Sequence, residues 1–584
     1  MQSIERATAL LRDTSSLEGA MAILRELGFG EAAFPLDSGA RSALGLPSSV
    51  RAACITQGRD SLRGLVIDLD DVPGTRESLT AVINALSRRS PQLLWIVVAI
   101  ARSTRELAIA SSSSSLSHTR IVSLLCNQDR VFESDAETLC ALSAAAGDTD
   151  LTTHARWLDV LGREAITRRF FRILRAVVSD LADSLGGAIN RSDRMELALL
   201  YTSLLIFLSF LETKGWLNGD FGFLSNGYSR CISEGGSYQR KILEPLFFGT
   251  LNTPAKARSA RARSFGRIPF LNGGLFARSH LEKRRRRCAF TDEAFGNAYG
   301  SLFSHYRFSG REDSTAWSEA SIDPEMLGKA FEALMAADER KTSGAFYTPQ
   351  ALVEDLVERA LDSMFRQEET VHPTLTGYRD NQILQRLRSI RVLDPACGSG
   401  AFLVHVLERI ASIRLEYGEE GPIAEVRRQV LMTSIFGVDL NPMAVWLCEL
   451  RLWLSIVIES ADGDPMRVVP LPNLDRHIRV GDSLAGGAFD NKVRFFGGRK
   501  LTTLRNRYMR ACGPRKLTLA RAMDREERDA AINVLRRKRA RLTARRKELL
   551  LGLRARDLFG ERRRLDRDSQ GQLADVRSRI RETT

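Results

Sequence analysis

Between residues 341 and 490, segments typical of strands alternate with segments typical of helices, and this alternation most constrains the fold. Three apolar runs of strand length, "IRVLD", "IFGVDL" and "HIRVGDSL", are separated by stretches long enough to form helices. A β-α-β-α-β series of this kind predicts a parallel, doubly wound sheet. The three runs carry Asp394, Asp439 and Asp482 at their ends, so the sequence predicts three carboxylates at consecutive strand tips.

The first strand leads into a glycine-containing loop, "DPACGSG", and then into a helix. Gly398 and Gly400 allow the backbone to approach a ligand closely, and the helix N-terminus offers free N–H groups to it. The loop matches neither the Gly-Lys-Ser/Thr of a P-loop nor the dinucleotide pattern G-x-G-x-x-G. Asp394 would repel a pyrophosphate, whereas it suits a cationic ligand such as the amino group and sulfonium of S-adenosylmethionine.

The two later strand tips suit the remainder of the same ligand. Asp439 can accept hydrogen bonds from both ribose hydroxyls, Leu440 can lie against the adenine ring, and Asp482 can accept from the adenine amino group. Each aspartate alone is as well explained by capping of the helix that follows it. The occurrence of all three aspartates in sequence order, together with the glycine loop, favours the interpretation that they bind one ligand.

The fold class predicted for the whole chain is α/β, in four parts. Residues 1–150 form a small α/β domain, residues 151–340 a helical domain, residues 341–498 the cofactor-side half-sheet, and residues 499–584 an Arg-rich helical hairpin or coiled-coil arm. The first part carries Asp68, Asp70 and Asp71, but no acid-x-Lys pair follows one strand later, as a Mg²⁺-dependent nuclease would need. We therefore expect a degenerate nuclease-like fold or a docking domain there.

The excess positive charge of the chain lies at its C-terminal end. Residues 499–584 hold 27 Lys/Arg and 11 Asp/Glu, a net charge of +16, whereas the whole chain has +14. Such a field attracts a polyanion, and nucleic acid is the favoured partner. A solvated basic helix pair that contacts an acidic protein is the alternative.

The cysteine pattern and the N-terminus indicate the cellular compartment. The eight cysteines include no C-x-x-C pair, which disfavours a zinc ribbon and predicts a reducing environment, and we expect no bound metal. The N-terminus lacks the pattern of a signal peptide. The uncharged run at 197–211 is too short to predict a membrane span, so we interpret it as a buried helix. The expected location is the prokaryotic cytoplasm.

Four phrases of the sequence resemble a known enzyme family. "RKTSGAFYTPQALVEDLV", "VLDPACGSGAFL", "IFGVDLNPMAVWLCELRLWL" and "RVGDSL" are similar to motifs X, I, II and III of γ-class adenine-N6 DNA methyltransferases. The phrases "FLETKGWL", "IPFLNGGLF" and "IDPEMLGKAFEAL" resemble those of type IIG restriction–modification enzymes and of the related methyltransferases of phage-defence systems such as BREX and DISARM. The resemblance implies a Rossmann-like methyltransferase sheet, S-adenosylmethionine as cofactor, and double-stranded DNA as partner.

The resemblance also implies roles for individual residues. The aromatic motif would wall the methionine end of the cofactor, the glycine loop would surround its amino acid part, and the acids of motifs II and III would hold the ribose and the adenine. The cofactor-binding residues expected in this way are Phe346, Tyr347, Thr348, Pro349, Asp394, Pro395, Ala396, Cys397, Gly398, Gly400, Asp439, Leu440 and Asp482.

The catalytic motif of the family is missing from this sequence. That motif, Asn/Asp/Ser-Pro-Pro-Tyr/Phe, presents the flipped adenine to the methyl group, and the 584 residues contain no Pro-Pro pair. We therefore expect no catalytic residue here, and we expect the motif and the target-recognition domain on a second polypeptide. In the family the first strand pairs with a fourth, so three strands alone would leave an apolar edge exposed. The alternatives are an inactive cofactor-binding scaffold of a defence complex and a fragment of a single-chain type IIG enzyme.

Overall fold

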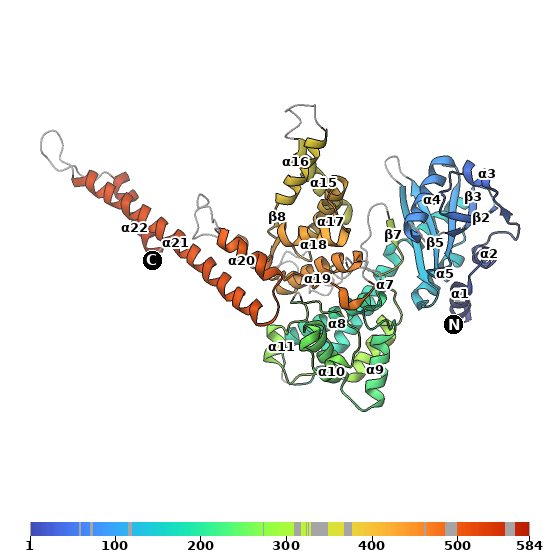
Figure 1. Cartoon of the computed structure of the whole chain (residues 1–584), viewed down its shortest axis with the longest axis horizontal. Helices are drawn as coiled ribbons and strands as arrows, with labels where there is room; N and C mark the ends of the chain where they lie inside the picture. Colours follow the sequence, from blue (N-terminus) through green and yellow to red (C-terminus); the bar gives the residue numbers. More distant parts are fainter. Residues whose placement is uncertain are drawn as a thin grey trace.

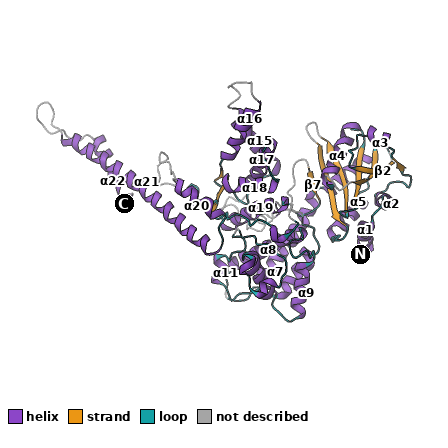
Figure 2. Ribbon diagram, in the orientation of Figure 1, coloured by secondary structure: helices purple, strands orange, loops and turns teal. Residues whose placement is uncertain are grey.

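The described residues form a seven-stranded sheet, a three-stranded sheet and many helices, so the predicted mixed α/β class is confirmed (Figures 1 and 2). The computed structural model describes residues 2–57, 60–69, 74–114, 119–187, 189–272, 274–308, 317–322, 324, 326, 328, 348–366, 376–460, 463–484, 499–554 and 567–582. Phe346 and Tyr347 of the predicted site, and Asp70 and Asp71 of the first domain, lie outside these residues.

The N-terminal unit is a mixed sheet between two layers of helices. Its strands follow the order β1-β2-β3-β4-β5-β6-β7, and the crossover helix α4 makes β3 and β4 parallel. One face packs against α1, α2, α5 and α6, and the other packs against α4. The elements are α1 (Gln2–Asp13), α2 (Leu17–Glu26), β1 (Phe34–Pro35), α3 (Ser38–Ala43), β2 (Val50–Gln57), β3 (Leu62–Leu69), α4 (Thr75–Arg89), β4 (Leu94–Ala101), β5 (Glu106–Ser114), β6 (Thr119–Asn127), α5 (Glu133–Ala144) and α6 (Asp150–Leu161).

The strands predicted near residues 62–69 and 93–101 are confirmed as β3 and β4. The seventh strand, β7 (Trp317–Glu319), comes from a distant part of the chain and pairs in parallel with β6. The sheet is therefore not built from residues 1–150 alone. Asp68, at the end of β3, pairs with Arg102 at 2.8 Å.

The middle of the chain is helical. The apolar run at 197–211 lies in α8, and the prediction of a buried helix is confirmed, since almost all of its side chains are buried. By length and composition α8 could also cross a membrane, but 83% of its apolar window is buried inside the protein. The elements are α7 (Arg163–Ser184), α8 (Arg191–Thr213), α9 (Phe223–Ser233), η1 (Gln239–Leu243), η2 (Pro245–Leu251), η3 (Ala255–Ala257), α10 (Ala260–Arg263), α11 (His280–Arg284), α12 (Asp292–Ala298) and η4 (Tyr299–Phe303).

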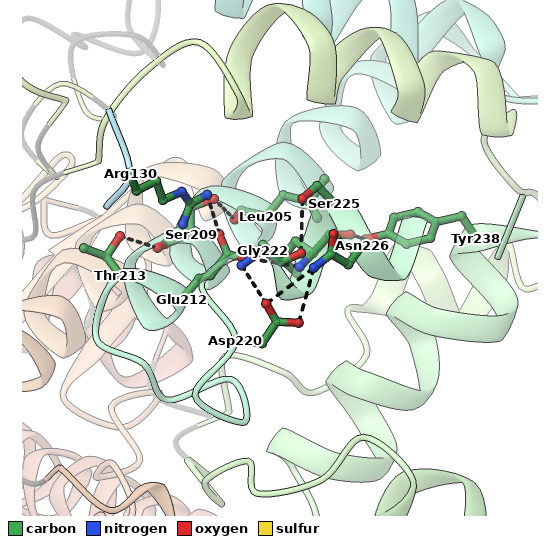
Figure 3. Close-up of polar contacts among 11 residues, drawn as sticks. Arg130, Leu205, Ser209, Glu212, Thr213, Asp220, Gly222, Ser225, Asn226 and Tyr238 are labelled. Carbon is green, nitrogen blue, oxygen red and sulfur yellow. Dashed lines mark hydrogen bonds and ion pairs between the residues drawn. The ribbon is translucent and has the colours of Figure 1, made fainter. Parts of the chain in front are cut away.

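The phrase "FLETKGWL" joins three parts of the molecule, and Figure 3 shows the contact of its Glu212 with Arg130. Buried Glu212 accepts hydrogen bonds from Arg130 of the N-terminal unit at 3.0 Å and from the backbone N–H of Leu224 at 2.9 Å. Burial raises the pKa of Glu212, and its two donors oppose that shift. Two residues on, the Nζ of Lys214 donates to the carbonyls of Ile458 and Ser460 at the end of α19 (Pro442–Glu459). The motif therefore has a structural role at the junction.

The helical unit and the three-stranded sheet share one hydrophobic core. Side chains of α7 and α8 belong to the same buried cluster as Leu407 and Trp453 from the helices of that sheet. The sheet has the order β10-β9-β8, and all of its strands are parallel, as predicted. The elements are α15 (Gln350–Arg366), α16 (Thr376–Ser389), β8 (Val392–Asp394), α17 (Ala401–Glu416), α18 (Ile423–Thr433), β9 (Ile435–Asp439), α19, η5 (Pro465–Arg467) and β10 (Ile478–Val480).

A helical arm extends from the side of this sheet and ends far from the body (Figure 1). It comprises α20 (Arg499–Met509), α21 (Gly513–Arg554) and α22 (Arg567–Glu582), and α22 packs back along α21. The predicted basic helical hairpin is therefore present.

Candidate functional site

The three predicted aspartates lie at one edge of the small sheet. Asp394 ends β8, Asp439 ends β9, and Asp482 follows β10 by two residues. Because the strands are parallel and Asp439 is in register with Val480, their carboxyl ends meet at the same edge. Ligands of doubly wound sheets bind in the crevice outside this edge.

Each aspartate makes the same local turn. One carboxylate oxygen accepts from the backbone N–H two residues on: Asp394 from Ala396 at 3.0 Å, Asp439 from Asn441 at 2.9 Å, and Asp482 from Leu484 at 2.8 Å. Asp394 and Asp439 are not the caps of the helices that follow them, since α17 is capped by Gly400 and α19 by the side chain of Asn441. The alternative interpretation as simple helix caps is therefore wrong for Asp394 and Asp439.

The loops of the three motifs are tied to one another. The second carboxylate oxygen of Asp439 accepts from the N–H of Gly398 at 2.9 Å, which joins motif II to motif I. Ser483, next to Asp482, donates to the carbonyl of Pro395 at 2.5 Å. The backbone N–H of Cys397 donates to the carbonyl of Val438 at 3.0 Å. These bonds position the strand tips before any ligand arrives.

The two glycines of the loop have different roles. Gly398 has φ +51°, and a Cβ placed there would meet no atom within 4 Å, so the space beside it is open to a ligand. Gly400 has φ +88°, and a Cβ there would lie 2.6 Å from the Sγ of buried Cys448. Gly398 therefore leaves space for a ligand beside the loop, and Gly400 allows the loop to pack closely on α19.

The electrostatics of the edge suit a cationic ligand. Burial raises the pKa of Asp394, and the nearby Asp439 charge adds to that shift. A positive group placed between these carboxylates would relieve their mutual repulsion. Leu440 is 57% exposed, which leaves its side chain free to contact an aromatic ring.

Two other predicted residues precede helix α15, and Cys397 lies within the loop. Thr348 is half-buried and Pro349 is exposed, directly before α15, which packs against α17. The carbonyl of Pro349 accepts from the N–H of Leu352 and Val353 in the first turn of α15. Cys397 is buried beneath the loop, facing Gly437 of β9, so its side chain is a packing group.

Sequence reasoning missed the arginine that supports the loop. Arg451 is 1% exposed, and its Nη1 donates to the carbonyl of Ser399 at 3.1 Å and to the Ser399 hydroxyl at 3.4 Å. Gly328, from "IDPEMLGKAFEAL", lies against the same serine, since a Cβ there would be 2.5 Å from its Oγ. A charged residue in the middle of the largely apolar helix α19, where Glu449 is the other one, is the sequence signal that could have revealed Arg451.

The comparisons with known proteins cover the part of the chain that contains these strands. Residues 374–484 match the family model of the MmeI DNA-methyltransferase domain. A protein of Methanocaldococcus jannaschii named as a type II restriction enzyme and methyltransferase is 29% identical over 338 residues, which cover 51% of this chain and 28% of that protein. The adenine-specific methyltransferase PglX of Streptomyces coelicolor is 29% identical over 164 residues, which cover 27% of this chain and 11% of that protein.

Among solved structures, the type IIL restriction–modification enzyme MmeI in complex with DNA aligns with a TM-score of 0.38 and 20% identity, covering 55% of this chain and 40% of that one. The chain thus spans less than a third of the length of the curated relatives described above. The family-model match and the curated relatives confirm the resemblance drawn from the motifs: this part of the chain is similar to the methyltransferases of type II restriction systems and to an adenine-specific methyltransferase.

Proposed function

We propose that this chain is the S-adenosylmethionine-binding part of a site-specific adenine-N6 DNA methyltransferase of a prokaryotic restriction or phage-defence system. The observation that carries the proposal is the joined edge of the sheet, where three carboxylates and an open glycine loop lie together at the carboxyl ends of the strands. The cofactor, when bound, supplies an activated methyl group on its sulfonium.

The residues present fit the parts of that cofactor. Asp394 would accept from the α-amino group, and the open space beside Gly398 would admit the amino acid part against the loop backbone. Both oxygens of Asp439 already hold backbone N–H groups, and each retains a second lone pair for a ribose hydroxyl. Asp482 is exposed and would accept from the adenine amino group.

Calorimetric titration of the full chain with S-adenosylmethionine tests this assignment. We expect Asp394→Ala to abolish measurable binding, because a charge-assisted hydrogen bond and the attraction to a cation are lost together. Glu420→Ala, which removes an exposed carboxylate outside the site, should bind as the wild type does. Unchanged affinity in Asp394→Ala would show that the loop does not hold the cofactor.

The small sheet has an unpaired edge and an open face within the described part of the chain. No described strand pairs with the outer edge of β8, and Leu393 on that strand is 61% exposed. Leu393 is in register with half-buried Phe436 of β9. Parallel sheets are normally covered on both faces, and apolar edge strands are normally paired.

As part of the same proposal, a polypeptide segment outside these 584 residues adds a strand to β8 and carries the catalytic Asn/Asp/Ser-Pro-Pro-Tyr/Phe motif. The absence of any Pro-Pro pair from the sequence supports this step. Co-expression with the product of the adjacent reading frame should yield a complex that methylates adenine in DNA, while Leu393→Lys should weaken the association. A complex that binds cofactor yet never methylates DNA would favour the inactive scaffold, and an in-frame continuation of the gene would favour a single-chain enzyme.

A further inference from the structure

The base of the arm is fixed to the sheet-bearing body. The side-chain amide of buried Asn473 donates to the carbonyls of Tyr508 and Ala511 at 2.8 Å each, and that of Asn272 donates to the Ala511 carbonyl at 3.2 Å. These residues hold the turn between α20 and α21. The direction of the arm is therefore set by buried hydrogen bonds.

Acidic and basic residues are separated along α21. Its acidic residues near the base pair with cations: Asp524 with Arg476 at 2.6 Å, and Glu527 with Arg479 at 2.8 and 3.3 Å. Beyond them, the twelve residues 536–547 hold eight Lys/Arg and no Asp/Glu. Residues 513–535 of α21 hold five Lys/Arg and four Asp/Glu, a net charge of +1, so the positive charge of this helix is concentrated in residues 536–547.

The distal cations face solvent. Seven of the eight are exposed: Arg536, Arg537, Arg539, Arg541, Arg545, Arg546 and Lys547. Arg545 pairs with Glu548 at 2.8 Å. Within the described residues, Arg536, Arg537 and Arg541 have no carboxylate partner.

The contact between α21 and α22 leaves this basic face free. Half-buried Leu535 and Leu542 on α21 and buried Leu573 and Val576 on α22 mark the seam between the two helices. At about 100° per residue, Arg536 and Arg537 point well away from Leu535 and Leu542. By the same rotation Arg539 and Arg546 lie close to the apolar stripe. Four cations, Arg536, Arg537, Arg541 and Lys547, lie on the opposite side of the helix and form a ridge.

We propose that this ridge of residues 536–547 binds the phosphate backbone of double-stranded DNA without reading its sequence. The inference rests on the proposed function, which makes DNA the polyanion that reaches this chain. The ridge is about 18 Å long, and duplex DNA carries about ten phosphate charges over that length, which is enough for each of the four outward-facing cations to contact a separate phosphate. Contacts of this kind would increase the affinity for all DNA sequences alike.

The test compares two triple variants of the full chain. The distal variant is Arg536→Gln, Arg537→Gln and Arg541→Gln. The matched control is Arg521→Gln, Arg525→Gln and Arg528→Gln, which removes three exposed arginines of the same helix near its acidic residues. The probes are a fluorescent DNA duplex of about 30 base pairs, long enough to span the ridge, and polyglutamate as a competitor, with binding measured by anisotropy at several salt concentrations.

Loss of three phosphate contacts should reduce the salt slope of log K by about 2.7 and the affinity at about 0.1 M salt on the order of 100-fold. The control variant should change either quantity little. Equal losses in both variants, an unchanged distal variant, or preferential binding of polyglutamate would overturn the proposal. Binding of S-adenosylmethionine should be normal in both variants, and a wild-type chain that binds cofactor but no DNA would refute the arm's role while the cofactor assignment stands.

Discussion

The clearest prediction concerns Gly400, where the cofactor loop crosses helix α19. Replacing it with alanine has two separate costs. An L side chain at φ +88° costs about 1–2 kcal/mol. The new Cβ would also lie 2.6 Å from the Sγ, 3.2 Å from the Cβ and 3.3 Å from the Cα of Cys448, which is fully buried and cannot move aside freely. Overpacking of this kind costs about 1–3 kcal/mol.

Gly418 is a matched control for the first of these costs. Its φ is +87°, and a Cβ there would meet nothing within 4 Å. Gly418→Ala should therefore show the backbone cost alone, about 1–2 kcal/mol. Gly400→Ala should lose about 2–5 kcal/mol in total, and the difference between the two variants measures the contact with Cys448.

Urea unfolding followed by tryptophan fluorescence measures the loss, because Trp446 and Trp453 lie on α19. With a slope of about 2–3 kcal/mol per molar, the midpoint for Gly400→Ala should fall by about 1–2 M. Hydrogen exchange across residues 394–404 gives a local measurement of the same loop. The double variant with Cys448→Ala should lose less than the sum of the single variants, with a coupling of about 1–2 kcal/mol. Equal stability of Gly400→Ala and Gly418→Ala, or no coupling to Cys448, would refute this reasoning.

Two further predictions concern the cofactor sheet. His477 packs on Phe436 at 4.4 Å between ring centres, and burial lowers its pKa to about 4. The neutral histidine therefore stabilises the fold fully above the unfolded pKa of about 6.5, and this stabilisation is lost as the pH falls from there toward 4. Urea midpoints between pH 7 and about pH 4.5 should fall less steeply in His477→Phe than in the wild type, and parallel profiles would contradict this assignment. Arg451→Met should weaken S-adenosylmethionine binding about 10- to 100-fold in calorimetric titration, because a charged hydrogen bond to the loop is worth about 1.5–3 kcal/mol. The control variant Arg467→Met changes an exposed arginine and should bind the cofactor normally. Equal affinities of the two variants would show that Arg451 does not position the loop.

The local signals in the sequence predicted the strands of the small sheet and the edge at which three aspartates lie. Apolar runs of strand length, each ending near an aspartate, predicted β8, β9 and β10 and the edge at which Asp394, Asp439 and Asp482 lie. These features depend on neighbouring residues, since strand length, turn residues and helix periodicity are short-range properties. The same is true of the buried helix α8 and the basic arm.

Other features had no local signal. Strand β7 has only three residues and joins a sheet whose other strands lie almost 200 residues earlier, so its pairing depends on where the helical unit returns the chain. The junction made by Glu212 and Lys214 and the anchoring of the arm by Asn272 and Asn473 join segments far apart in sequence. A polar residue in a motif indicates that its side chain has a role, but the tertiary packing determines which residue becomes its hydrogen-bond partner.

The sequence by itself therefore determined the order of the elements, the chemistry at the strand tips and the separation of charge along the chain, because these depend on residue type and spacing. The tertiary structure alone decided that the aspartates shape turns rather than cap helices, that Arg451 supports the loop, and that Leu393 lies on an open edge. Those outcomes depend on which surfaces become buried together, and burial is a property of the whole folded chain.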